Sequence, residues 1–221
     1  MFTLILIVVT IGCHHRMPNK HLPTDPYEIL TGAQAACAQT KQVIGHYKLR
    51  GSGFKRMLGS VDLDIIAKKP AYLYLSIASF FGQPARVVTY DGKKLYGASD
   101  YSLDEILNMA LSPEDLADVL LRSISVKKSD IRTVSSENGS LQLAYRAGQT
   151  LSLTIDPVTF EILTREFRDA EGELIYRVEY KDFPKRFDIT ARYKGSEHSM
   201  TLTSQDAQIN QGNFDEQLFR R

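Results

Sequence analysis

The chain has 221 residues, with 27 Lys and Arg against 26 Asp and Glu, so its formal net charge is +1. This length falls in the usual range for one domain with a sizeable core. The basic residues are scattered in pairs such as Lys68-Lys69 and Lys93-Lys94, and they form no concentrated basic face of the kind that binds phosphate backbones. The charge pattern therefore argues against nucleic acid as a partner.

The first residues form an apolar run that ends at Cys13. The run is too short to cross a hydrocarbon core, which needs about 20 residues, and it is typical of a signal peptide. Thr10-Ile11-Gly12-Cys13 resembles a bacterial lipobox, in which a small residue precedes a cysteine that receives diacylglycerol and becomes the new N-terminus. We expect residues 1–12 to be a lipoprotein signal peptide, Cys13 to be lipidated and residues 13–23 to be a tether. An ordinary secretory signal, or an uncleaved anchor with an incidental cysteine, is the alternative.

A helix signal follows the tether. Asp25 and Pro26 are typical of an N-cap and a first helical residue, and the helix is predicted to extend to about Gln42. Cys37 lies within this helix and has no disulfide partner if Cys13 carries a lipid. We therefore expect Cys37 to be a small packed hydrophobe, the usual state of a free cysteine.

From Tyr47 onward the apolar period changes to two. The segments 61–65 and 151–155 alternate strictly between apolar and polar residues, which indicates strands with one apolar and one wet face. Asp91-Gly92 and Asn138-Gly139 are hairpin signals. The predicted strands span about 46–57, 60–68, 71–78, 85–91, 93–98, 131–136, 140–146, 150–156, 160–169, 173–182, 186–193, 197–203 and 206–210.

Two further helices are predicted between the two groups of strands, over residues 103–110 and 112–122. Ser112 and Pro113 supply an N-cap and a first-turn proline for the second of them. Because a long antiparallel sheet must bury its apolar face, the helices are expected to pack on it. The expected fold class is mainly β with helices (α+β): a strongly curved antiparallel sheet, or unclosed β-barrel, covered by about three helices in a single domain over residues 24–221. An apolar cavity can form between the helices and such a sheet.

The polar residues form no catalytic constellation. Asp62 and Asp64 share a strand face, but this is the face opposite the apolar side chains, so both carboxylates are expected to be solvated. His46 and His198 are isolated in predicted strands. No nucleophile, general base and oxyanion site occur together, so the sequence predicts no enzyme, and it predicts no cofactor and no metal site.

An apolar loop follows the predicted strand 71–78. Two adjacent phenylalanines lie in a predicted turn, the segment Ser79-Phe80-Phe81-Gly82-Gln83-Pro84. Turns are normally polar, so we expect another apolar surface to cover the two rings. In a lipid-anchored protein the membrane can bury them. Folding of both rings back onto the core is the alternative.

The order of these motifs resembles the LolA/LolB superfamily of lipoprotein carriers and outer-membrane lipoprotein receptors, and within it the lipid-anchored LolB-like branch. The resemblance rests on Arg50-Gly51 in the first strand and on the Leu-rich strand that continues into Phe80-Phe81-Gly82. The strand pair joined by Asp91-Gly92, the paired central helices and the later meander extend it from about Thr24 to the C-terminus.

The resemblance implies a lipid-anchored protein of the outer membrane, facing the periplasm, that binds lipoprotein acyl chains in an apolar cavity and helps to insert lipoproteins. It implies a membrane-insertion role for Phe80, Phe81 and Gly82, and as partners a periplasmic lipoprotein carrier and membrane lipid, with the protein itself a monomer. The residues expected to line the acyl cavity are Leu73, Leu75, Ile77, Leu116, Val119, Leu120, Leu151, Leu153 and Ile155. The alternative left open is that these residues are ordinary core and the protein is a non-transporting outer-membrane lipoprotein that acts as an interaction or assembly scaffold.

Overall fold

The structure is a computed structural model, and it describes residues 22–51, 60–77, 86–97, 111–126, 128–137 and 140–212. Within these ranges the strands form one 13-stranded sheet in which every pair is antiparallel. The strands are β1 (Gln42–Gly51), β2 (Val61–Lys68), β3 (Tyr72–Ile77), β4 (Arg86–Asp91), β5 (Leu95–Tyr96), β6 (Ile131–Glu137), β7 (Ser140–Tyr145), β8 (Thr150–Ile155), β9 (Ile162–Arg168), β10 (Leu174–Asp182), β11 (Arg186–Tyr193), β12 (Ser196–Thr203) and β13 (Gln208–Ile209).

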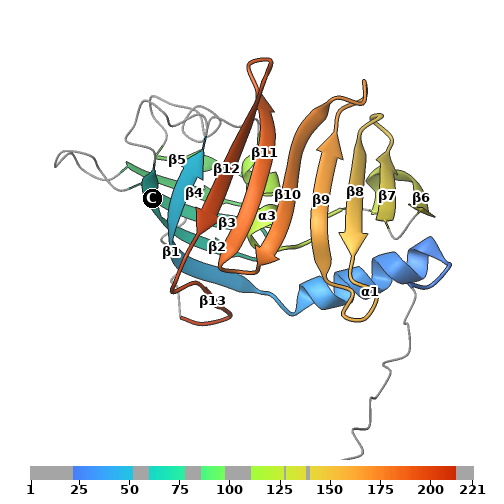
Figure 1. Ribbon diagram of the computed structural model, residues 1–221, viewed down its shortest axis with the longest axis horizontal. Helices are drawn as coiled ribbons and strands as arrows, with labels where there is room; N and C mark the ends of the chain where they lie inside the picture. The colour runs from blue at the N-terminus through green and yellow to red at the C-terminus, as the bar shows by residue number, and fades with distance from the viewer. Residues whose placement is uncertain are drawn as a thin grey trace, which may run out of the picture.

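The sheet consists of two meanders, β1–β5 and β6–β12, which are joined where β1 pairs with β12. The short β13 also pairs with β1. Strands β5 and β6 end the sheet, and no pairing joins them in the described part of the chain, so the sheet is not closed. In Figure 1 the first meander runs crosswise behind the second, which shows how strongly the sheet curves. We call this curved sheet the half-barrel.

Two α-helices lie in the described ranges, α1 (Pro26–Ala38) and α3 (Pro113–Leu120), together with the short 3₁₀ helix η2 (Lys128–Asp130). Helix α1 crosses the lower ends of the strands in Figure 1 and contacts β6 and β7, whereas α3 contacts β2 and β3. The helix predicted over 103–110 lies outside the described residues, so the expected number of about three helices is not confirmed. Neither α1 nor α3 is long and apolar enough to span a membrane.

Both described helices begin at the predicted caps. Asp25 accepts a hydrogen bond from the backbone N–H of Tyr27 at 2.9 Å, and Ser112 Oγ accepts one from the backbone N–H of Asp115 at 3.0 Å. The predicted end of α1 at about Gln42 is wrong. The helix ends at Ala38 because Gln42 already pairs with β2, and its backbone N–H donates to the Asn210 side chain at 3.1 Å.

Every predicted strand has a counterpart, although β5 and β13 are shorter than expected. The hairpin at Asp91-Gly92 is confirmed: Gly92 has a positive φ of 87°, and Asp91 Oδ1 accepts hydrogen bonds from the backbone N–H groups of Lys93 and Lys94. Asn138 and Gly139 lie outside the described residues, but Glu137 pairs with Ser140, which confirms the second hairpin.

The core is one apolar cluster that draws side chains from both meanders and both α-helices. In β2 the residues Val61, Leu63 and Ile65 are buried while Asp62 and Asp64 point to the other face, as the alternation predicted. Cys37 is buried and free, so the prediction of a packed thiol is confirmed.

Helix α1 is seated on the sheet through a close contact at Gly32. A Cβ atom added there would lie 2.5 Å from Cδ1 of Phe160, which projects from the β8–β9 turn with an unusual positive φ of 59°. We expect Gly32→Leu to lower the free energy of unfolding by about 1–3 kcal/mol, because the new side chain displaces the ring or the helix. Urea unfolding measures the change, and Ala35→Leu at an exposed position of the same helix is the matched control. Equal effects of the two substitutions would contradict this seating.

Candidate functional site

The structure brings together the apolar residues predicted to face an acyl cavity. All but Ile77 are at most 4% exposed, and Ile77 is partly buried against the same cluster. They come from β3, α3 and β8, so one interior connects both meanders through the helix. The described side chains form a packed core there, and their role in holding acyl chains stays a prediction.

The remaining predicted site residues cannot be placed. Cys13, Phe80, Phe81 and Gly82 lie outside the described residues. The strands that flank the phenylalanine loop are described: Ile77, at the end of β3, pairs with Arg86, at the start of β4. The loop therefore connects two adjacent strands of the first meander.

Helix α3 is exposed in its first turn, at Glu114, and buried from Leu116 onward. Its residues Leu116 to Leu120 are consecutive and all buried, including the polar Asp118, as expected of a helix enclosed by the sheet rather than laid on its surface. Figure 1 shows α3 behind the strands β10 and β11 and in front of β3. We call α3 the plug of the half-barrel.

Three tyrosines from the strands donate hydrogen bonds to the plug. Tyr90 on β4 donates to the carboxylate of Glu114, and two tyrosines of β10 bind the opposite side. Tyr176 donates to Asp115 at 3.2 Å, and Tyr180 donates to the backbone carbonyl of Val119 at 3.0 Å. Burial raises the pKa of all three hydroxyls, so each remains a neutral donor. The plug is thus held from both meanders.

A buried ion pair ties the plug to β9. Asp118 accepts hydrogen bonds from the hydroxyls of Ser123 and Ser125, each at 2.6 Å, and its second oxygen lies 3.4 Å from Nη2 of Arg165. Arg165 is 3% exposed, donates from Nη1 to the Ser123 carbonyl at 2.6 Å and from Nε to the Tyr176 hydroxyl at 3.0 Å. Every polar atom of this cluster that the structure describes as buried has a partner.

Burial opposes the charged state of Arg165, yet the neighbouring Tyr176 and Asp118 leave the pKa of the guanidinium above its ordinary value. A buried pair of this kind adds little net stability over an apolar replacement, but removal of one partner leaves an uncompensated charge. The pair therefore fixes where the plug sits more than it stabilises the fold.

Sequence reasoning missed Asp118 and Arg165. The sequence analysis assigned a role to neither residue. One signal was present: Arg165 and Phe167 are two residues apart in β9, so their side chains lie on the same face of the sheet. Both residues pair with leucines of β8 whose side chains point inward. An arginine in the inward register of a strand indicates a buried partner.

The outer face of the half-barrel is polar, as predicted for Asp62 and Asp64. Asp64 lies 2.7 Å from Nδ1 of His46, and Asp62 lies 3.9 Å from Nζ of Lys48, with all four side chains at least 45% exposed. Each aspartate therefore lies beside a basic side chain of β1 on the exposed face of the sheet.

The hydrogen bond to Asp64 is the main reason that the pKa of His46 is raised. A raised folded-state pKa means that the protonated imidazole stabilises the fold below its unfolded pKa, and that this contribution disappears as the pH rises through the folded value. We expect an NMR titration of His46 to have a midpoint above the ordinary value of about 6.5, and Asp64→Asn to lower it. Asp62→Asn, which removes a more distant charge, should lower it less. An unchanged midpoint in Asp64→Asn would rule out this pairing.

Solved structures of other proteins are similar in fold to this half-barrel. A LolA superfamily protein from Nitrosomonas europaea superposes with a TM-score of 0.60 at 15% identity, over 89% of this chain and 98% of that one. The chain therefore has the fold of a LolA superfamily protein, and the predicted resemblance is confirmed at the level of the fold. This likeness does not distinguish the LolB-like branch.

Two other solved structures have TM-scores of 0.49. One is a putative outer membrane lipoprotein-sorting protein domain from Vibrio parahaemolyticus, 15% identical over 89% of this chain and all of that one. The other is a DUF1329 family protein from Desulfovibrio piger, 10% identical over 88% of this chain and 96% of that one. No protein family model and no curated protein matches the sequence.

Proposed function

We propose that this protein is a lipid-anchored envelope protein that binds lipoprotein acyl chains against the concave face of the half-barrel and helps to insert them into the outer membrane. The observation that carries the proposal is the plug: a short helix, enclosed by two meanders, that occupies the interior and is held at identified polar atoms. A short helix in this position can be displaced by a ligand whose apolar surface replaces that of the helix. The protein would act as a binding protein and not as an enzyme.

The energies of exchange support the replacement of the plug by acyl chains. Exposing the buried side chains of Leu116, Val119 and Leu120 costs about 1.5–3 kcal/mol each. An acyl chain gains ~0.8 kcal/mol for each CH₂ taken from water, so a single chain of ~16 carbons gains ~12 kcal/mol. One chain therefore offsets the loss of these contacts, and no nucleotide is required.

The anchor and the phenylalanine loop complete the proposal. A diacylglycerol on Cys13 would hold the protein at the outer membrane, facing the periplasm, where a periplasmic carrier delivers the cargo. The loop with Phe80, Phe81 and Gly82 would enter the bilayer, and each phenylalanine ring buried there contributes ~1.5–3 kcal/mol. The affinity for the cargo would then increase at each step, from carrier to receptor to membrane.

A scaffold function is the second candidate, and the packed interior favours it. Leu151 and Leu153 are 0% exposed, as in an ordinary core. A non-transporting lipoprotein would keep the plug in place permanently and use the outer face of the half-barrel for its interactions.

Transfer of a labelled lipoprotein from its periplasmic carrier tests the proposal. We expect the purified protein to accept the cargo and pass it to added liposomes. The double variant Phe80→Glu/Phe81→Glu should accept cargo normally but fail to deliver it. Val158→Glu is the control, because it also introduces a glutamate at an apolar side chain in a turn, one that is 55% exposed between β8 and β9. If the wild-type protein accepts nothing, the scaffold function is the better explanation.

A further inference from the structure

A cavity lies outside the packed interior, where the C-terminal end of α1 meets the start of β9 and the end of β10. Its volume is about 480 Å³, within the range of small-molecule sites, roughly 300–1,000 Å³. Its floor is apolar: Ile162, Cys37 and Tyr180 are all less than 9% exposed. The ring of Phe183 forms a wall. The cavity thus combines an apolar floor with a position at the protein surface.

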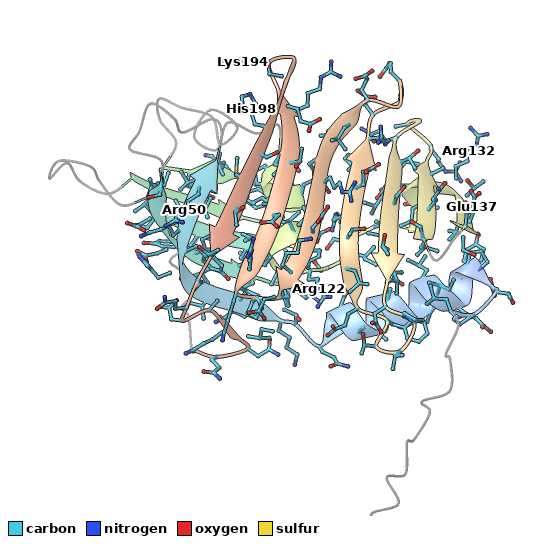
Figure 2. All side chains as sticks on the ribbon, in the orientation of Figure 1. Arg50, Arg122, Arg132, Glu137, Lys194 and His198 are labelled. Carbon is cyan, nitrogen blue, oxygen red and sulfur yellow. The ribbon has the colours of Figure 1, made fainter. Side chains whose placement is uncertain are left out.

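One cation stands at the edge of this floor. The guanidinium of Arg122 lies over the rings of Tyr180 and Phe183, 5.3 and 5.2 Å from their centroids, and Nε donates to the Ile162 carbonyl at 2.6 Å. The Arg122 side chain is 11% exposed. Figure 2 labels Arg122 near the lower ends of β10 and β11, beside the C-terminal end of α1.

The backbone of Arg122 is strained where α3 ends. Its φ is 51°, in the left-handed region that a residue with a bulky side chain rarely adopts. The backbone N–H of Arg122 donates to the Val119 carbonyl at 3.1 Å, so this left-handed residue ends the helix. The side chain is held by its hydrogen bond to the Ile162 carbonyl and by the two aromatic rings.

The rim of the cavity carries two cations, Arg122 and Lys181, and an anionic ligand can bind to Arg122 if it displaces the carboxylate now paired with it. Nη1 of Arg122 lies 3.2 Å from the Glu161 carboxylate, which is 54% exposed and easily displaced. Lys181 is a second cation at the rim, and its ammonium pairs with Glu179 at 2.6 Å. A partly desolvated guanidinium binds carboxylate or phosphate more strongly than a solvated one does.

We propose that this cavity binds a single acyl chain with an anionic head, such as a fatty acid or a monoacyl phosphate. The chain would lie above the buried floor, on the partly exposed apolar side chains of Leu163, Phe183 and Ile209. The head would displace Glu161 from Arg122. The cavity opens beside the end of α3 and no residue of that helix lines it, so the proposed site does not require α3 to be displaced.

Calorimetric titration of the full chain tests the site with four probes: decanoate, decyl phosphate, decyl maltoside and inorganic phosphate. Decanoate and decyl phosphate are expected to bind at least ~10-fold more tightly than the maltoside, because only they reach Arg122 with a charge. Inorganic phosphate alone should not bind measurably, which distinguishes the amphipathic ligand from a free anion. Equal binding of the neutral and anionic probes would overturn the proposal, as would an absence of binding.

Two pairs of variants locate the binding. Ala36→Phe fills the cavity and should abolish decanoate binding, whereas Ala35→Phe, its exposed neighbour on α1, should not. Glu161→Gln removes the competing carboxylate and should tighten decanoate binding up to ~5-fold, whereas Glu171→Gln in an exposed turn should not. Decanoate binding that survives Ala36→Phe would overturn the site.

Lipoprotein acceptance, measured on the same samples, separates this site from the proposed function. If decanoate binds and Ala36→Phe abolishes it while no lipoprotein is accepted, the site stands and the transport function fails. If lipoprotein is accepted but Ala36→Phe leaves decanoate binding unchanged, the transport function stands and the site is overturned.

Discussion

Replacing Asp118 with alanine is expected to lower the free energy of unfolding by about 3–5 kcal/mol. The reason is that Arg165, which is 3% exposed, keeps its charge and loses its only carboxylate partner among the described contacts. The hydroxyls of Ser123 and Ser125 also lose their acceptor. Urea unfolding followed by circular dichroism measures the change.

A double-mutant cycle separates the ion pair from the loss of packing. Asp118→Ala/Arg165→Met should be less destabilised than the sum of the two single changes, because no unpaired charge remains. Asp62→Ala is the matched control: its pair with Lys48 is 45% exposed on both sides, and its loss should cost about 0–1 kcal/mol. A loss for Asp118→Ala no larger than that of the control would mean that the pair does not hold the plug.

Replacing Leu120 with alanine is expected to cost about 2–5 kcal/mol of unfolding free energy, because it removes a side chain that is 0% exposed and leaves a void between α3 and the sheet. An apolar void of this kind stays dry and admits apolar probes. The variant should therefore take up benzene or xenon, which the wild-type protein excludes. Uptake tests directly whether the space held by the plug can receive an apolar ligand.

Leu163→Ala is the matched control, because it makes the same substitution at an exposed position. Leu163 lies on the outer face of β9 and is 39% exposed, so its truncation should cost less than about 1 kcal/mol and should not promote uptake of benzene or xenon. Should Leu120→Ala be as stable as Leu163→Ala, α3 would not be packed as the structure describes. Should it be destabilised without uptake, the interior would collapse onto the void, as an ordinary core does.

The sequence alone determined the local elements. Strict alternation in segments such as 61–65 and 151–155 predicted strands with one buried face, because side chains in a strand alternate between faces. Asp25 and Ser112 predicted the starts of the helices because capping depends only on neighbouring residues. The unclosed, curved sheet also followed, since a long antiparallel sheet with one apolar face must be covered.

Contacts between distant segments were decided only by the tertiary structure. The pairing of β1 with β12 joins the two meanders, and pairing of β1 with β2 and β13 ends α1 four residues before the predicted position at Gln42. The same is true of the buried pair Asp118–Arg165 and of Arg122 on its two aromatic rings. A charged residue in a period-two or period-3.6 pattern looks solvated in sequence, and whether it is buried depends on which other element covers that face. Here α3 lies inside the half-barrel and covers the face of the sheet that carries Arg165. No local sequence pattern specifies this position of α3.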